Sequence, residues 1–195
     1  MADEGKNVFN KCHNNEKIIK SIDDIFERFM NQSERELEEQ ICDKVRLLRY
    51  NSFDWYKSFA NFEDMGTWPK MCGIDIRFTI GNLIKTAKMI KEVRNGKLIL
   101  KYEGTEYQER WDALKNLITK IDSIQKNKDL IYERFPIILF PGGEVRQKDY
   151  NLWAIKNNEA LCKIFKYDID DGNSRALAYC LNNLNRAPSF IGIGE

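Results

Sequence analysis

A run of four apolar residues, 137–140, stands between Pro136 and Pro141. Proline fixes its own φ angle, lacks a backbone N–H and disfavours helical geometry in the residue before it. The run is therefore predicted to be extended rather than helical. Four adjacent apolar side chains gain free energy by leaving water, so we expect this segment to be buried. Gly142 and Gly143 follow it and predict a turn.

Elsewhere apolar residues recur mostly at spacings of three and four, which is typical of helices packed on a core. The first two predicted helices are joined only by Asn31 and Gln32, and a link this short favours an antiparallel hairpin. The last predicted helix of the chain is expected to end before Pro188. Helices are predicted over residues 15–30, 33–48, 52–62, 82–94, 105–124, 147–165 and 174–185.

Apolar and polar residues alternate over 74–80 and 98–102, which predicts two short strands. The first of these segments is alternatively the start of a longer helix. The expected fold is mainly α: a helical domain with an N-terminal helical hairpin and at most two or three short β-strands. Its expected parts are a flexible arm (1–14), an N-terminal helical subdomain (15–65), a mostly helical C-terminal subdomain (74–186) and an apolar tail (187–195).

Composition excludes several classes of protein. Of 195 residues, 43% are hydrophobic and 31% charged, which suits a chain with a buried core and not a disordered one. No apolar run approaches the roughly 18 residues of a membrane span. The polar N-terminus does not resemble a signal peptide, and the five cysteines contain no CxxC. We therefore expect an intracellular protein without membrane contact, in the reducing cytoplasm or nucleus.

Charge is segregated although its total is only +1. Residues 16–40 hold eight acidic and four basic residues, whereas residues 70–101 hold eight basic and two acidic ones. Clustered positive charge is typical of phosphate binding, and Tyr50 and Trp55 could stack on bases. The alternative is a solvated helix face that pairs with the acidic helices. The predicted nucleic-acid-binding residues are Arg46, Arg49, Arg77, Lys85, Lys88, Lys91, Arg94, Lys97 and Lys101.

Sequence motifs that would indicate catalysis or metal binding are weak in this chain. His13 is the single histidine and lies in the polar arm, so we predict no catalytic residue, no metal site and no cofactor. The acidic segment 168–173 departs from the register of a calcium loop and is predicted to be a turn that caps the last helix. Gly142 and Gly143 lack the remainder of a phosphate-binding motif. Asp75 with later carboxylates and lysines is the one candidate for a metal-dependent nuclease.

The apolar tail carries Phe190, Ile191 and Ile193, whose exposure to water would be costly. Either the tail folds back onto its own domain or it docks on a neighbouring subunit, which makes these three residues the candidates for oligomerisation. The sequence favours a non-enzymatic interaction protein that self-assembles and binds single-stranded nucleic acid, as coat proteins and nucleoproteins do. The alternatives are a protein-binding regulator or inhibitor and a metal-dependent nucleic-acid-processing enzyme.

Overall fold

The computed structural model describes residues 10–11, 49–50, 52–67, 76–98, 107–132 and 135–194. Within these residues, 48% are helical and 24% lie in strands. The expectation of a mainly α fold with at most two or three short strands is therefore wrong. The chain divides into two compact units, one made of Met1–Ser58 with Phe190–Glu195 and the other of Phe59–Ser189.

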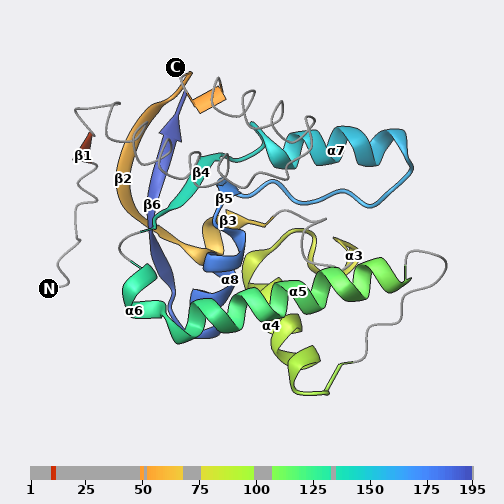
Figure 1. The fold of residues 1–195 in the computed structure, drawn as a ribbon. Helices are drawn as coiled ribbons and strands as arrows, with labels where there is room; N and C mark the ends of the chain where they lie inside the picture. The colour runs from red at the N-terminus through yellow and green to blue at the C-terminus, as the bar shows by residue number, and fades with distance from the viewer. Residues whose placement is uncertain are drawn as a thin grey trace, which may run out of the picture. The chain divides into compact units, whose positions relative to one another are not determined.

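The described strands form a mixed sheet in the order β1-β2-β6-β4-β5-β3 (Figure 1). Strands β1 and β2 pair antiparallel, as do β4 and β5, whereas β3 runs parallel to β5. The first and third strands are only two residues long. The bounds are β1 Asn10–Lys11, β2 Asp54–Asn61, β3 Met65–Gly66, β4 Ile137–Pro141, β5 Tyr167–Asp171 and β6 Arg186–Ile193.

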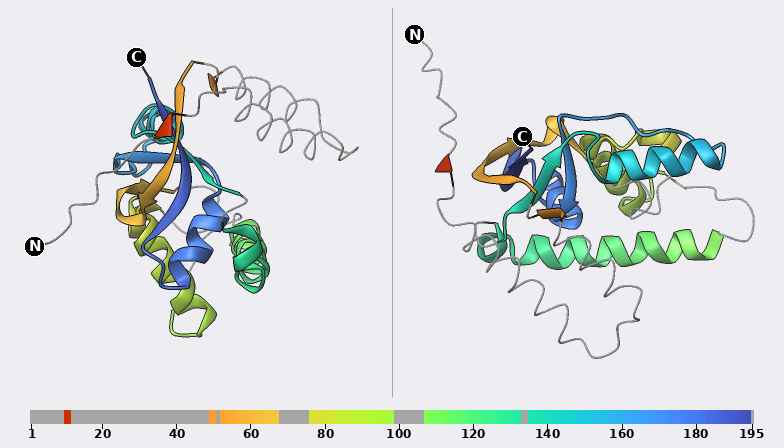
Figure 2. Two further views of the ribbon diagram at one scale, coloured as in Figure 1. Left: turned by 90° about the vertical axis from the view of Figure 1, so that its left-hand side faces the viewer. Right: turned by 90° about the horizontal axis from the view of Figure 1, so that it is seen from above.

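Helices of the second unit lie on both sides of β4 and β5. Helix α8 contacts β4 and also α4 and α5, whereas α7 contacts β5. Figures 1 and 2 show α7 on the opposite side of these strands from α5. The bounds are η1 Phe62–Asp64, α3 Ile76–Thr79, α4 Leu83–Arg94, α5 Tyr107–Lys126, α6 Lys128–Ile131, α7 Arg146–Lys156 and α8 Asn173–Leu181.

Two local predictions are confirmed closely. The run between the prolines is β4, and each of its four apolar residues is at most 3% exposed. Helix α4 begins where the sequence places it, because the Asn82 side chain accepts a hydrogen bond from the Lys85 backbone N–H at 2.8 Å. Leu83, Ala87 and Ile90 form its buried side, as helical spacing predicts.

The predicted aromatic helix at 52–62 is instead strand β2 followed by the short helix η1. Aromatic residues at this density satisfy helical spacing and strand alternation equally well, and they suit strands intrinsically. Trp55 and Ala60 are buried in β2 while Phe59 is exposed. Backbone partners from β1 and β6 complete the strand, and residues this distant in the sequence are invisible to a local pattern.

The predicted strand at 74–80 is wrong as well, since Ile76–Thr79 is helix α3. Phe78 is 60% exposed and Ile80 is 37% exposed, so these alternating apolar residues do not bury a common face. For the second predicted strand, Leu98 lies outside any element and residues 99–102 lie outside the described residues. The two predicted N-terminal helices, residues 15–30 and 33–48, also lie outside the described residues.

The predicted helix 147–165 ends early, at Lys156. Asn158 adopts a φ of 54°, and the N–H of Glu159 donates to Ala154 O at 2.8 Å. This is a Schellman ending with asparagine at the left-handed position. Helix α8 ends in the same way, with Asn183 at φ 60° and the Leu184 N–H on Tyr179 O at 3.2 Å. Asparagine tolerates this geometry, which explains both early stops.

Two segments expected to lie outside regular structure are strands. The apolar tail belongs to β6, in which Ala187, Pro188, Ser189 and Ile191 are buried. The acidic segment predicted as a turn begins with β5, whose central residues are buried. Carboxylates inside a buried strand contradict the usual surface preference of aspartate, and they require partners from elsewhere in the fold.

Candidate functional site

Four lysines form an exposed basic surface on α4 and the turn after it. We define the basic surface as Lys85, Lys88, Lys91 and Lys97, all of which are exposed. The opposite side of α4 is buried against the core through Leu83 and Ile90. In the described part of the chain, none of the four lysines forms an ion pair. Their charges therefore face solvent.

Arg94 is used within the protein. Its Nη2 lies 2.7 Å from Asp122 Oδ1 of α5, and its Nη1 donates to Gln125 Oε1 at 3.2 Å. These contacts join the end of α4 to α5. We therefore leave Arg94 out of the basic surface, although helical spacing had grouped it with the lysines.

The remaining predicted basic residues contribute little that the structure describes. Arg49 is half-buried, and Arg46, Lys101 and the side chain of Arg77 lie outside the described residues. The expectation that Tyr50 and Trp55 stack on bases is wrong, because they are only 5% and 4% exposed. Trp55 Nε1 donates to Tyr50 O at 2.9 Å, so its polar edge is satisfied internally.

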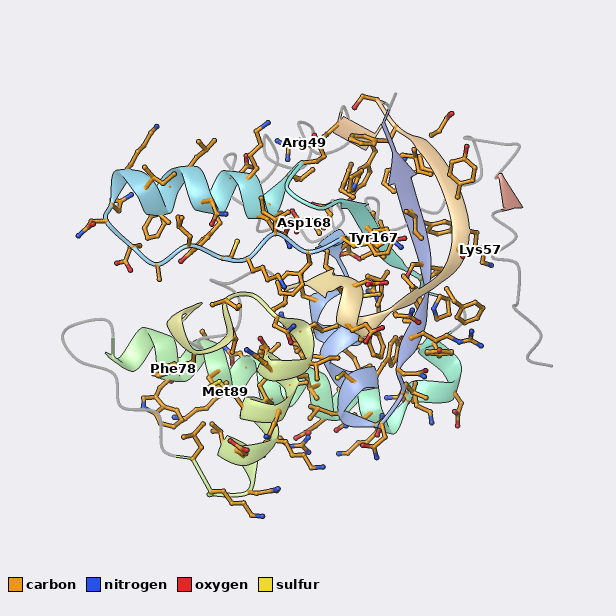
Figure 3. The ribbon with its side chains drawn as sticks, turned by 180° about the vertical axis from the view of Figure 1, so that it is seen from behind. Arg49, Lys57, Phe78, Met89, Tyr167 and Asp168 are labelled. Carbon is orange, nitrogen blue, oxygen red and sulfur yellow. The ribbon has the colours of Figure 1, made fainter. Side chains whose placement is uncertain are left out.

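A second cluster, buried and acidic, lies between β5 and the start of α7. Asp168 is 1% exposed, and its Oδ2 accepts the Gln147 backbone N–H at 2.7 Å. Asp170, two residues along the same strand, is 5% exposed and forms an ion pair with Arg146 Nε at 2.9 Å. Because side chains two apart in a strand share a face, both carboxyl groups point toward α7. Figure 3 shows Asp168 in this interior position.

Burial is the largest cause of the pKa shifts in this cluster. The pKa of Asp168 is raised from 3.8 to about 7, chiefly by burial and also by the charge of Asp170, while the Gln147 N–H and Arg146 oppose the shift. Burial, together with the Asp168 charge, also raises the pKa of Cys162 to about 11. A thiol with so high a pKa is a poor nucleophile at neutral pH.

The buried cluster contacts the start of α7 through a hydrogen bond and an ion pair. No group of three potential metal-ligating side chains occurs among the described residues. The Gly142 N–H donates to Lys166 O at 2.9 Å and the Gly143 N–H donates to Gln147 Oε1 at 3.2 Å, so these amides are not available to a phosphate. The prediction that Gly142 and Gly143 form a structural turn is therefore confirmed.

The expected cap on the last helix is wrong. Gly172, and not an aspartate, is the N-cap of α8, and it makes no side-chain capping bond. Asp171 pairs with Arg175 at 2.6 Å one turn further on. Asp168 caps a helix, but that helix is α7, through the bond to the Gln147 N–H.

The three candidate oligomerisation residues differ in their exposure to solvent. Ile191 is 4% exposed, Phe190 is half-buried and Ile193 is 45% exposed. A Cβ at Gly192 would contact the ring of Trp55 and the Cβ of Phe53, so this part of β6 packs against its own chain. Of the three, Ile193 retains the greatest exposure.

Comparison with protein families, curated proteins and solved structures finds no match in any of the three. None of the helices in the described part of the chain combines the length and apolar character that crossing a bilayer requires.

Proposed function

We propose that this protein binds single-stranded nucleic acid through the basic surface of α4 and the turn that follows. The observation that carries the proposal is the exposure of four lysines without an ion pair among the described residues. A free lysine ammonium attracts phosphate without reading sequence, and release of counterions from the nucleic acid supplies the free energy. The buried side of α4 fixes the helix on the core, so the charges are held in place before binding.

The proposed role is that of a non-enzymatic interaction protein that self-associates, as coat proteins and nucleoproteins do. The exposed side chain of Ile193 is the remaining candidate contact between subunits. The free thiols of Cys162 and Cys180 support a reducing compartment, either cytoplasm or nucleus. Asp75, on which the nuclease alternative depends, lies outside the described residues, so that alternative gains no support.

The test measures fluorescence anisotropy of a labelled single-stranded RNA and a single-stranded DNA across a salt series. Wild-type protein is expected to bind both, with affinity falling as salt rises. Lys85→Glu with Lys88→Glu should weaken binding at least tenfold, because two attractive charges become repulsive. Absence of binding near physiological salt, or equal binding by this double variant, rejects the proposal.

A matched control uses lysines on another element. Lys148 and Lys156 are exposed on α7, so Lys148→Glu with Lys156→Glu makes the same change in net charge. If binding depends on the basic surface, the α7 double variant retains most of its affinity. An equal loss in both double variants indicates attraction to overall charge and contradicts the assignment to α4.

A second candidate function, binding of a protein partner, is favoured by exposed apolar side chains around α7. Leu152 and Ile155 are 53% and 66% exposed, and Leu161 and Ile164 after the helix are 50% and 56% exposed. Exposed apolar side chains in such number are typical of interaction surfaces. This alternative predicts a stoichiometric protein complex lost in Leu152→Asp with Ile155→Asp and no affinity for nucleic acid.

A further inference from the structure

Apolar side chains are exposed at the end of α3, in the short connection after it and in the first turn of α4. Phe78 is 60% exposed, Ile80 is 37% exposed, and Ile84 in the first turn of α4 is 43% exposed. The alternating pattern over 74–80 predicts that Phe78 and Ile80 lie on the inner face of a strand, and it indicates no functional role for them. An aromatic ring exposed to this extent is free to contact a ligand with its face.

This connection is held firmly. Ile80 adopts a φ of 50°, which is strained for a β-branched residue. Its carbonyl accepts the Lys163 N–H at 2.8 Å, and the next carbonyl, of Gly81, accepts the Thr67 N–H at 2.8 Å. The Asn82 N–H donates to Thr79 O at 2.9 Å. Surrounding hydrogen bonds of this kind are what allow strained backbone to persist, and such strain concentrates at functional positions.

The apolar side chains adjoin the basic surface. Helices α3 and α4 contact each other, and Ile84 stands next to Lys85 and one helical turn before Lys88. Figure 3 shows Phe78 well separated from the buried Asp168, on the part of the molecule that carries Met89 of α4. An exposed ring therefore stands on the helix that contacts α4, whose lysines have no ion pair among the described residues.

We infer that Phe78 stacks on an unpaired base of a single-stranded nucleic acid whose phosphates lie along Lys85 and Lys88. This inference rests on the proposed function. A single strand presents an aromatic base face and a phosphate on each nucleotide, which matches one aromatic ring beside a row of lysines. A duplex hides its base faces in its own stack, so it meets only the lysines. The structure thus assigns to Phe78 the preference for single strands.

The experiment compares a labelled oligouridylate with an RNA duplex of equal length. Phe78→Leu keeps apolar bulk but removes the ring face, and it should weaken binding of the oligouridylate roughly tenfold while leaving duplex binding unchanged. Phe78→Tyr should restore the affinity. Phe59→Leu, at another exposed phenylalanine covered by Arg186 at 5.0 Å, is the matched control and should bind as wild type.

The outcomes separate this inference from the proposed function. If wild type binds neither RNA, both fail. If wild type binds and the Lys85→Glu, Lys88→Glu variant does not, but Phe78→Leu binds the oligouridylate as wild type does, the proposed function stands and the role of Phe78 is rejected. An equal loss of oligouridylate and duplex binding in Phe78→Leu also rejects stacking. Far-ultraviolet circular dichroism confirms that each variant is folded.

Discussion

Asp168 caps a helix 21 residues away in the sequence, because its Oδ2 accepts the backbone N–H of Gln147 at 2.7 Å. The N-cap residue of that helix, Val145, has no side-chain acceptor of its own. A carboxylate near the start of a helix satisfies an otherwise unpaired N–H and interacts favourably with the helix dipole. Strand β5 therefore holds α7 in place through a polar contact inside the core.

The pH dependence of stability should change in Asp168→Asn. The pKa of Asp168 is raised in the folded state, from 3.8 to about 7. Its contribution to the free energy of unfolding is therefore complete below pH 3.8 and is lost as the pH rises through about 7. Urea unfolding from pH 4 to pH 8 should show a fall of a few kcal/mol in wild type that is smaller in Asp168→Asn. Asp129→Asn is the control and should follow the wild-type profile, because the Asp129 side chain is 97% exposed. If Asp168→Asn also follows the wild-type profile, Asp168 is not the cause of the pH dependence.

Removal of one partner of the buried ion pair should destabilise the protein strongly. The Asp170 side chain is 3% exposed, and its ion pair with Arg146 at 2.9 Å compensates its burial. Arg146→Met removes the guanidinium partner of a buried carboxylate and should lower the free energy of unfolding by about 3–5 kcal/mol. Adding Asp170→Asn removes that charge and should recover part of the loss, as measured by chemical denaturation. A double variant less stable than Arg146→Met refutes this explanation.

The two glycines of the turn after β4 should respond unequally to alanine. A Cβ at Gly142 would overlap the backbone carbonyl of Phe165, which cannot move aside independently. Gly143 has a positive φ of 82°, but its Cβ would meet only the flexible side chain of Ile164. Gly142→Ala should cost more than about 3 kcal/mol and Gly143→Ala about 1–2 kcal/mol in thermal unfolding. The reverse order would disprove the close approach at Gly142.

The asparagine that ends α7 should tolerate glycine but not alanine. Asn158 has a φ of 54°, which alanine adopts at a cost of about 1–2 kcal/mol and glycine at little cost. Asn158→Ala should lower the melting temperature, and Asn158→Gly should leave it equal or slightly higher. Asn157→Ala is the control, because Asn157 has a negative φ of −106°. Equal effects at the two positions would exclude the left-handed geometry as the cause.

Neutralising the basic surface should change the salt dependence of binding. On a single strand each lysine–phosphate contact contributes about 0.7 to the slope of log affinity against log salt concentration. Lys85→Gln with Lys88→Gln should therefore reduce the slope by about 1.4, as measured by anisotropy between low and physiological salt. An unaltered slope would mean that these lysines do not contact phosphate.

Local signals located several elements correctly. Prolines on both sides marked β4, and Asn82 with helical spacing marked α4, because backbone restriction and capping act over a few residues. The consecutive asparagines at 157–158 and 182–183 are typical of helix ends. The apolar spacing nevertheless predicts helices that continue past them. The exposure of Lys85 and Lys88 also followed from their position opposite Leu83 and Ile90.

Partners distant in the sequence decided the remainder. The aromatic segment at 54–61 is a strand because β1 and β6 supply its hydrogen bonds. Asp168 has a partner in the core because the Gln147 backbone N–H of α7 donates to its Oδ2. Arg94 does not belong to the basic surface because it forms an ion pair with Asp122. The sequence by itself determined the local backbone preferences and which face of α4 is charged. Only the tertiary structure decided which polar groups are paired, since a buried charge or an unsatisfied backbone group is stabilised by whichever partner the fold brings within hydrogen-bonding distance.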